Sequence, residues 1–395
     1  AWYAIQALPY LGEPKVESAS GIFHAYYANA LSAFIVNSNP KIKNVLESWK
    51  AYTPDAFLSN LQKNQELKSV VLNATPWVLE AENEEEQKRR LALLFDINRL
   101  SNQEGNMLEK LRQNQLSTGA WSWFKGMRED RYTTQQIVLG FAKLGEKQVI
   151  DLRQNPMVLQ MVKKATIFLD KEINEDYKKI LKRFPEKIHQ NHISSLQIQY
   201  LYARTLLMEE VSMQDSYSEA FEYYLSQAKK YWLKQNNYMQ AMIAVILNRT
   251  GYRNEAEGIL RSLQEMSLQD PELGMYWRQE TGWYWYQAPV ETHTMIIEAF
   301  QEVLKKPALV DQMKIWLLKQ KQTTHWKTSS ATAEAVFALL MNGKSLLDND
   351  EMVLIKVGNK EIPANTNDMN VEAGTGYFKT SWMGEEIKAD MGNIE

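Results

Sequence analysis

The sequence contains no cysteine. This absence excludes disulfide bonds, cysteine–zinc sites, thiol nucleophiles and an internal thioester. It indicates no compartment, because a protein without cysteine suits either redox environment. No stretch approaches the roughly 20 consecutive apolar residues of a membrane span, and the first residues do not resemble a signal peptide. The chain begins inside an apolar run and without methionine, so we expect it to begin within a longer protein.

An excess of basic charge is also missing. The 395 residues include 45 Lys and Arg against 48 Asp and Glu, which gives a formal net charge of -3. This balance lacks the basic footprint of a nucleic-acid-binding protein. Hydrophobic residues make up 45% and charged residues 24%, as in an ordinary globular protein with a sizeable core.

Most of the chain has helical periodicity. Pro76–Leu100 shows it well, because Pro76 suits a first helical turn and Glu84 begins a run of glutamates that each precede a basic residue by four positions. Short breaks containing Gly, Asn, Pro or Ser separate the other predicted helices. These are Val16–Val36, Asn44–Ala51, Pro54–Val71, Gly105–Gln115, Thr133–Leu144, Pro156–Phe184, Ile193–Glu209, Ser216–Lys234, Tyr238–Asn248, Asn254–Met266, Thr292–Leu304, Pro307–Lys321 and Ser330–Asn342. Without a convincing strand among them, they predict an all-α domain over residues 1–345.

A turn with tryptophan precedes a helix that opens with threonine at three places. The three units are Trp121 and Trp123 with Thr133, Trp283 and Trp285 with Thr292, and Trp326 with Thr332. The fourth and eighth residues after each threonine are apolar, namely Ile137, Phe141, Ile296, Phe300, Val336 and Leu340. Threonine can cap free N–H groups at a helix start, and the apolar positions form one buried face. The repeat predicts helical hairpins stacked in a ring or a solenoid, and periodicity does not distinguish the two.

The pattern changes after Gly343. Met352–Val357 alternates as a strand, Gly358 and Asn359 mark a turn, and Lys360–Pro363 could form the second strand of a hairpin. Gly376–Trp382 has the pattern of another strand. Three short strands make a poor independent core. We therefore predict that residues 346–395 are an incomplete piece of a β-domain.

The segment from Leu8 to Leu31 has a recognisable frame. It reads Leu8-Pro9-Tyr10-Leu11, then Glu17-Ser18-Ala19-Ser20-Gly21, then Tyr26-Tyr27-Ala28-Asn29-Ala30-Leu31. This frame resembles the thioester segment of bacterial α2-macroglobulin-like proteins, which have Glu-Cys-x-Glu-Gln at the Glu17–Gly21 position. In that family the glutamine side chain acylates the cysteine sulfur. Because Ser18, Ser20 and Gly21 replace the cysteine, glutamate and glutamine, the resemblance implies a degenerate thioester site without covalent chemistry.

Further landmarks carry the resemblance along nearly the whole chain, in the expected order. They are Asn73–Trp77, Arg90–Phe95, Gly119–Phe124, Gly282–Pro289 and Lys327–Glu334. The resemblance implies that residues 1–345 form an (α/α)6 toroid. In the family this toroid is inserted into a β-sandwich called the CUB-like domain, of which residues 346–395 would be a part.

The family consists of large extracytoplasmic proteins that resemble the protease traps of animal blood. The resemblance therefore implies a non-enzymatic module of a protease-binding protein, periplasmic or anchored to the envelope. Its expected partners are target proteases, held non-covalently, and neighbouring macroglobulin-like and CUB-like domains of the parent chain. No cofactor, nucleic acid or membrane span is expected.

Three other features could carry chemistry. Ser18 as a nucleophile would need a base within hydrogen-bond reach, and His24 lies on the wrong side of the predicted helix. We therefore predict no catalytic residue. His189 and His192 have a spacing that could place two imidazoles on one helix face, but without further ligands we favour a surface pair over a metal site.

The third feature is a cluster of aromatic residues: Tyr276, Trp277, Trp283, Tyr284, Trp285 and Tyr286, with Glu280, Glu291 and His293 nearby. Toroidal helical folds also host polysaccharide lyases and glycosidases, in which aromatic rings stack on sugars and carboxylates perform acid–base catalysis. A carbohydrate-active enzyme is thus the alternative function. The Trp-x-Trp unit recurs at Trp121 and Trp123, as a structural repeat would, so we favour a structural role or an aromatic interface.

Overall fold

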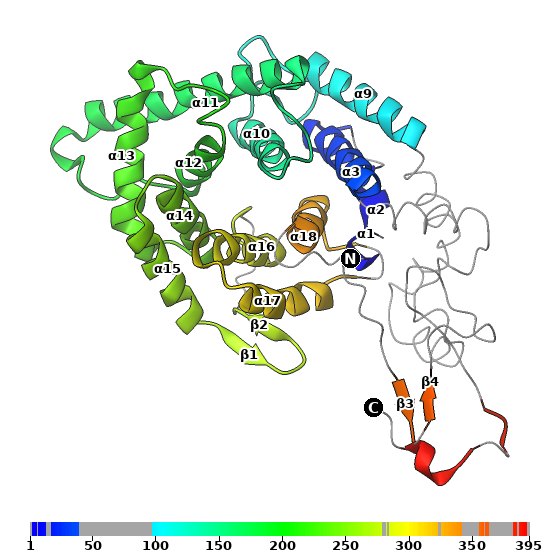
Figure 1. The fold of residues 1–395 in the computed structure, drawn as a ribbon. Helices are drawn as coiled ribbons and strands as arrows, with labels where there is room; N and C mark the ends of the chain where they lie inside the picture. The colour runs from blue at the N-terminus through cyan, green and yellow to red at the C-terminus, as the bar shows by residue number, and fades with distance from the viewer. Residues whose placement is uncertain are drawn as a thin grey trace.

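A computed structural model describes residues 2–5, 7–12, 17–38, 97–278, 282, 284–322, 325–341, 355–358, 360–362, 382–384 and 387–392. In this part of the chain most residues are helical, which confirms the all-α class (Figure 1). Several predictions lie outside the described residues: the helices Asn44–Ala51 and Pro54–Val71, nearly all of Pro76–Leu100, the landmarks Asn73–Trp77 and Arg90–Phe95, and the strand from Gly376.

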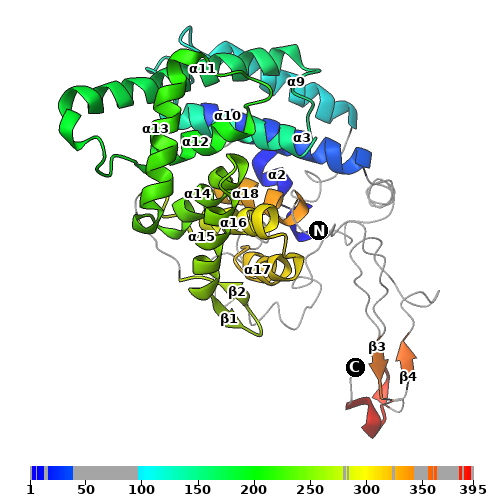
Figure 2. The ribbon, with the colours of Figure 1, turned by 60° about the vertical axis from the view of Figure 1, so that its left-hand side comes forward.

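Along the chain, the long helices belong alternately to an inner and an outer layer (Figures 1 and 2). The inner helices are α3 (Ala19–Ser38), α10 (Arg131–Glu146), α12 (Ser195–Leu206), α14 (Asn237–Arg249), α16 (Pro289–Ala299) and α18 (Ser329–Met341). Each contacts the next, and α18 also contacts α3. The outer helices are α9 (Ile97–Asn114), α11 (Pro156–Arg183), α13 (Asp215–Tyr231), α15 (Arg253–Glu265) and α17 (Pro307–Lys319). α9 packs on α3, α11 on α10, α13 on α12, α15 on α14 and α17 on α16.

The remaining helical elements are short. They are α1 (Trp2–Ile5), α2 (Leu8–Gly12), η2 (Pro185–Lys187), η3 (Trp232–Lys234), the π-helical turn η4 (Phe300–Leu304) that continues α16, and η6 (Ala389–Gly392). Each helix predicted between Gly105 and Asn342 is present, with its ends shifted; α9 begins earlier than predicted, at Ile97.

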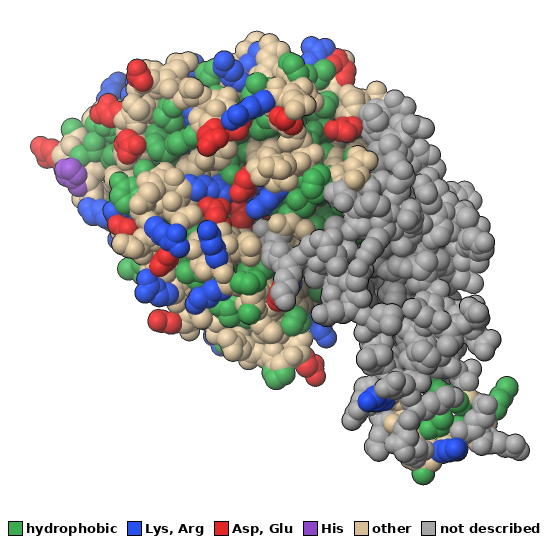
Figure 3. Space-filling view, in the orientation of Figure 1, with side chains coloured by type: hydrophobic (Ala, Val, Ile, Leu, Met, Phe, Trp, Pro, Cys, Tyr) green, Lys and Arg blue, Asp and Glu red, His purple; other side chains and the backbone are tan. Residues whose placement is uncertain are grey.

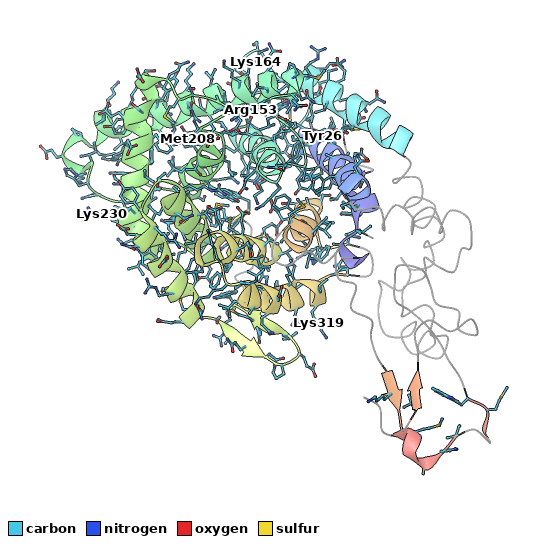
Figure 4. The ribbon with its side chains drawn as sticks, viewed as in Figure 1. Tyr26, Arg153, Lys164, Met208, Lys230 and Lys319 are labelled. Atoms are coloured by element: carbon cyan, nitrogen blue, oxygen red, sulfur yellow. The ribbon has the colours of Figure 1, made fainter. Side chains whose placement is uncertain are left out.

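Apolar side chains fill the space between the two layers. Tyr26 on α3, labelled in Figure 4, is fully buried and packs against Phe141 of α10 with ring centroids 5.4 Å apart. Gly140 of α10 leaves room for Phe23 of α3, because a Cβ atom at residue 140 would lie 2.3 Å from the ring of Phe23. In contrast, Lys164 on α11 and Lys230 on α13 lie at the outer rim (Figure 4). Charged side chains of both signs are interspersed over the surface that Figure 3 shows.

Three buried indoles mark the repeat. The Nε1–H of Trp121 donates to the carbonyl of Leu111 in α9 at 2.9 Å, Trp277 to Leu263 in α15 at 2.7 Å, and Trp326 to Leu317 in α17 at 2.9 Å. Carbonyls in the last turn of a helix lack partners within it. Each indole fills the space beside an outer helix and also satisfies one of these carbonyls. The predicted repeat of hairpins is therefore real.

Two details of the predicted repeat are wrong. Trp277, not Trp285, is the buried indole between α15 and α16, because it enters there directly after a strand; the predicted Trp283 lies outside the described residues. Threonine also has another role than the one predicted. Thr134 Oγ1 accepts from the Trp121 backbone N–H at 2.9 Å, as Thr332 Oγ1 does from Trp326 at 3.1 Å.

The caps of these helices come from other residues. Asp130 accepts from the Thr133 N–H at 2.6 Å, and Thr328 from the Ala331 N–H at 3.0 Å. The predicted buried face is confirmed at five of its six positions, since Ile137, Phe141, Ile296, Phe300 and Val336 are buried. Leu340 is half-buried.

A short hairpin interrupts the helical part, where no strand was predicted. Strands β1 (Leu268–Asp270) and β2 (Gly274–Tyr276) pair antiparallel, with Leu268 opposite Tyr276. β2 packs against α17. Gly274 has φ +69°, and a Cβ atom there would lie 2.2 Å from the carbonyl oxygen of Gln312 in α17. Three-residue strands are too short to show alternation, so no sequence pattern indicates them.

The predicted hairpin near the carboxyl end is confirmed in the part that the structure describes. Strands β3 (Ile355–Val357) and β4 (Lys360–Ile362) pair antiparallel, with Ile355 opposite Ile362 and Val357 opposite Lys360. The turn lies at Gly358, whose φ is +60°. This local pairing is what the alternation and the glycine predicted.

Candidate functional site at the amino-terminal ends of the inner helices

Ser18 is the residue that caps the start of α3. Its Oγ accepts from the Gly21 N–H at 3.0 Å, and its carbonyl accepts from the Ile22 N–H at 2.9 Å. The Ala19 N–H donates to the carbonyl of Trp123 at 3.0 Å, which ties the helix start to the tryptophan turn. Serine is among the best N-cap residues. The residue at the family's cysteine position thus has a structural role, and the described residues give it no hydrogen bond to His24.

This role gives a prediction. Replacing Ser18 by alanine is expected to destabilise the chain by about 1 kcal/mol, because the Gly21 N–H loses its acceptor. Ser18→Asp, which supplies another capping oxygen, is the matched control and should retain the stability of the natural chain. Urea denaturation followed by circular dichroism measures both. Equal stability of the alanine and aspartate variants would show that the cap contributes nothing.

A cavity of about 170 Å³ opens beside Ser20, between α3, α10 and α18. The polar side chains that line it are Ser20, His24, Tyr132, Gln136, Lys143, Ser330 and Glu334. Rings of Phe23, Tyr27 and Tyr132 form much of the rest. Because Ser20 and Ser330 lie in the first turns of their helices, the cavity is at the amino-terminal ends of the inner helices.

Lys143 belongs to a buried ion network that connects the inner helices. Its Nζ lies 3.1 Å from Glu298 of α16 and 2.9 Å from Glu334 of α18. Glu298 also accepts a hydrogen bond from the hydroxyl of Tyr202 in α12. Arg249 of α14 lies 3.9 Å from Glu298. The network therefore joins α10, α12, α14, α16 and α18 through side chains alone.

On its far side the network reaches a second cavity, of about 720 Å³, at the carboxyl ends of α10, α12 and α14. Arg249 lines it and pairs with Glu302 at 2.5 Å and with Glu146 at 3.6 Å. Arg153, labelled in Figure 4, also lines it. Charged groups thus extend from one cavity to the other through the inner layer.

The network keeps its central groups ionised. Burial acts to lower the pKa of Lys143, but Glu298 and Glu334 outweigh it and leave the pKa above its usual value. Burial acts to raise the pKa of Glu298, and Lys143 and Arg249 outweigh it, so the pKa lies below the usual value. At Glu291, which is hydrogen-bonded to Ser330 beside the cavity, burial raises the pKa. The same cause lowers the pKa of His24 to about 4, so its imidazole is neutral near pH 7.

The structure divides the predicted aromatic cluster. Trp285 packs against Tyr132 and Tyr238, with centroids 5.1 and 5.9 Å apart, so it lies at the same end as the cavity. Tyr284 and Tyr286 stack on each other at 5.2 Å, and Tyr284 is 63% exposed. The other members are elsewhere. Trp277 is buried against His293 and Phe300, Tyr276 belongs to β2, and Trp283 is outside the described residues.

A second aromatic pair lies beside Ser18. Trp123 and Phe124 stack with centroids 6.1 Å apart and are 60% and 41% exposed. The repeat predicted a structural role for Trp123, and its exposure was not predicted. We call Trp123, Phe124, Tyr284 and Tyr286 the aromatic face. The carbonyl of Trp123 accepts a hydrogen bond from the Ala19 N–H at the start of α3. Trp285, between Tyr284 and Tyr286 in the chain, contacts Tyr132 in the wall of the cavity.

The two histidines His189 and His192 lie in an irregular segment after η2, not on the helix face that a metal pair would need. The ring of His192 lies near Phe184, and its Nε2 is 2.9 Å from the carbonyl oxygen of Lys187. Among the described residues, no group of three or more His, Asp or Glu side chains is arranged to hold a metal ion.

The site residues that sequence reasoning missed are Lys143, Tyr202, Arg249, Glu298 and Glu334. A signal existed for two of them. Lys143 and Glu298 interrupt apolar runs, Ile137–Leu144 and Met295–Phe300, where a charged side chain needs a partner to be buried. The residues that pair with Lys143 and Glu298 lie on helices far apart in the sequence, so the sequence does not indicate them.

Comparison with models of known protein families gives no match, and no curated protein is similar to this chain either. In the part of the chain that the structure describes, no helix combines the length and the apolar character that crossing a bilayer requires.

Proposed function

We propose that this chain is the thioester-domain equivalent of a bacterial α2-macroglobulin-like protein, and that its helical part is an (α/α)6 toroid. The sequence landmarks support the family. The toroid is supported by the contacts of the inner helices, since α18 returns to α3, and by the outer helix that packs on each of the first five. Residues 346–395 would belong to the CUB-like domain, and the paired β3 and β4 are compatible with such a domain.

The proposed role is non-enzymatic: a movable module in an extracytoplasmic protein that encloses a protease without a covalent bond. The observation that carries this role is the position of Ser18. It caps α3 where the family has a reactive cysteine, yet the exposed rings of Trp123 and Phe124 are kept next to it. Exposed aromatic surface is costly unless a partner covers it. We propose that a macroglobulin-like domain of the parent chain covers this face, as the family's own architecture would require.

The test uses the full-length parent protein and an active protease. After cleavage, the protease is expected to co-migrate with the cleaved protein under native conditions and to separate from it in denaturant, because enclosure holds it without a bond. The same protease inactivated at its catalytic residue is the control and should not co-migrate. Failure of the active protease to co-migrate would leave a purely structural role as the better explanation. A conjugate that survives denaturant and maps to Ser18–Gly21 would contradict the non-covalent mechanism.

A variant that removes one exposed ring of the aromatic face provides a second test. Tyr284→Ser should loosen the docking of the module, so that the parent protein loses retention of the protease. Tyr217→Ser on α13 replaces a tyrosine on an outer helix and is the matched control.

A carbohydrate-active enzyme is the second candidate. The observation that favours it is the combination of two stacked aromatic pairs, in which Trp123, Phe124 and Tyr284 are exposed, with Glu291 and Glu334 in inner helices. A carboxyl group with a raised pKa, such as Glu291, suits a general acid in glycoside cleavage. Release of reducing ends or unsaturated products from a panel of polysaccharides would support this candidate, provided that Glu291→Gln abolishes it.

A further inference from the structure

The carboxyl end of α11 projects past the ring of helices. With 28 residues, α11 is the longest helix in the part of the chain that the structure describes, and at 1.5 Å per residue it is about 42 Å long. Figures 1 and 2 show its last turns reaching beyond α13 at the left of each picture. The chain then returns through η2 and an irregular segment before α12. This end of the molecule therefore protrudes and can meet a flat surface.

Hydrogen bonds and a ring contact join this end to the carboxyl end of α13. The Nζ of Lys230, a residue labelled in Figure 4, and the hydroxyl of Tyr231 both donate to the carbonyl of His189, at 3.1 and 2.6 Å. The ring of His192 lies 5.8 Å from that of Phe184, the residue directly after α11. The two helix ends thus form one continuous surface.

This surface, residues 181–187 and 230–234, is the basic tip. It has five exposed basic side chains and one exposed acidic one, namely Lys182, Arg183, Lys187, Lys230 and Lys234 against Glu186. Within the described part of the chain none of the five basic groups forms an ion pair, whereas Lys178, Lys179 and Lys229 just outside the tip each have a carboxylate partner. Because the whole chain has a net charge of -3, the positive excess at this end is a local feature.

The helix dipole explains only part of this charge. Basic residues in the last turn stabilise the negative end of a helix, which accounts for Lys182 and Arg183 of α11 and for Lys230 of α13. Lys187 and Lys234 lie beyond both of these helices. A role in stabilising helix ends also gives no reason for exposed apolar side chains among the charges.

Three large apolar side chains of the basic tip are exposed. Leu233 is 71% exposed, Phe184 45% and Leu181 39%. Single exposed apolar side chains are ordinary, but a group of them rimmed by charge marks an interaction site. Lysine and arginine combined with exposed leucine and phenylalanine suit the boundary of an anionic lipid bilayer. A soluble polyanion would pair with the charges but offers no apolar phase for the leucine and phenylalanine.

We propose that the basic tip docks on a bilayer that contains anionic lipids. Lys182, Arg183 and Lys187 contact the headgroup phosphates. Phe184 and Leu233 enter the boundary between headgroups and acyl chains, so the contact is peripheral. This inference uses neither the family nor the aromatic face, and its test needs no protease, so it succeeds or fails independently of the proposed function.

The test is sedimentation of the full chain with vesicles of phosphatidylcholine, with or without an equal amount of phosphatidylglycerol. We expect binding to the anionic vesicles to be at least about tenfold stronger, because basic groups near such a surface are attracted to it. The binding should weaken in salt of about 1 M, where the Debye length falls to about 3 Å. Equal binding to the two kinds of vesicle, or no binding to the anionic ones, would overturn the proposal.

Removal of charge locates the contact. The double variant Lys182→Gln with Arg183→Gln should weaken binding to anionic vesicles about thirtyfold, since each basic residue near such a surface contributes roughly 1 kcal/mol. Lys163→Gln with Lys164→Gln is the matched control, because both lysines are exposed on the same helix about 28 Å away. This control should bind as the natural chain does. Circular dichroism confirms that the variants are folded, and an equal loss in both double variants would overturn the assignment to the tip.

The apolar contact separates a bilayer from a soluble polyanion. Leu233→Ser should weaken binding to anionic vesicles about tenfold, because a leucine no longer leaves water, while any binding of soluble polyphosphate stays unchanged. Leu318→Ser, which changes an exposed leucine on α17, is the control and should alter neither. If Leu233→Ser binds anionic vesicles as the natural chain does, the tip is a site for soluble polyanions and the bilayer is the wrong partner.

Discussion

Lys143→Met is expected to lower the free energy of unfolding by about 3–5 kcal/mol, because the change leaves a buried carboxylate without its main partner. Lys143 Nζ lies 3.1 Å from Glu298 and 2.9 Å from Glu334, and the side chains of Lys143 and Glu298 are 5% and 7% exposed. Methionine keeps the length and apolar contacts of the lysine stem, so the loss reports mainly on charge. Urea denaturation monitored by circular dichroism measures it.

Two controls separate the charge effect from packing. Lys147→Met, at the C-cap of α10, removes a lysine whose partner Glu146 is 3.8 Å away and partly exposed, so it should cost less than about 1 kcal/mol. The double variant Lys143→Met with Glu298→Gln should recover part of the loss, because the amide needs no counter-charge. A single variant as stable as the natural chain would show that the network does not stabilise the fold.

Lowering the pH from 7 towards 4 is expected to destabilise the chain, with His24 and His293 each contributing up to about 3 kcal/mol. Burial lowers the pKa of both from 6.5 to about 4 in the folded state. The unfolded chain therefore takes up these two protons first as the pH falls. The stability is fully present above pH 6.5 and is lost progressively between pH 6.5 and 4. A shift of about 2.5 units at roughly 1.4 kcal/mol per unit gives the magnitude.

The measurement is a series of urea unfolding curves between pH 7.5 and 4.5. In His293→Gln, which keeps a donor for the Met313 carbonyl that lies 2.8 Å from Nε2, the slope of stability against pH should fall by about half. His189→Gln changes an exposed histidine and should leave the slope unchanged. The depressed pKa of Glu298 adds to the slope only below about pH 4.5. The raised pKa of Glu291 acts in the opposite direction, because the folded chain takes up that proton first. A slope that neither His24→Phe nor His293→Gln alters would contradict this origin.

The local pattern of the sequence determined the helices, because short-range signals specify them. Asn155 and Pro156 begin α11, where Asn155 Oδ1 accepts from the Val158 N–H at 3.1 Å, and the hairpin of β3 and β4 forms around Gly358. The tryptophan repeat was visible for the same reason, since Trp121 and Trp326 each lie in a turn that precedes a helix.

Only the tertiary structure decided what these elements bring together. Lys143 and Glu334 lie 191 positions apart in the chain and meet because α10 and α18 both belong to the inner layer. The aromatic cluster looked continuous in sequence, yet Trp277 fills a gap under α15 while Tyr284 faces solvent. The physical reason is that periodicity defines which face of a helix is apolar, whereas the partner of a buried charge or ring depends on how distant helices pack.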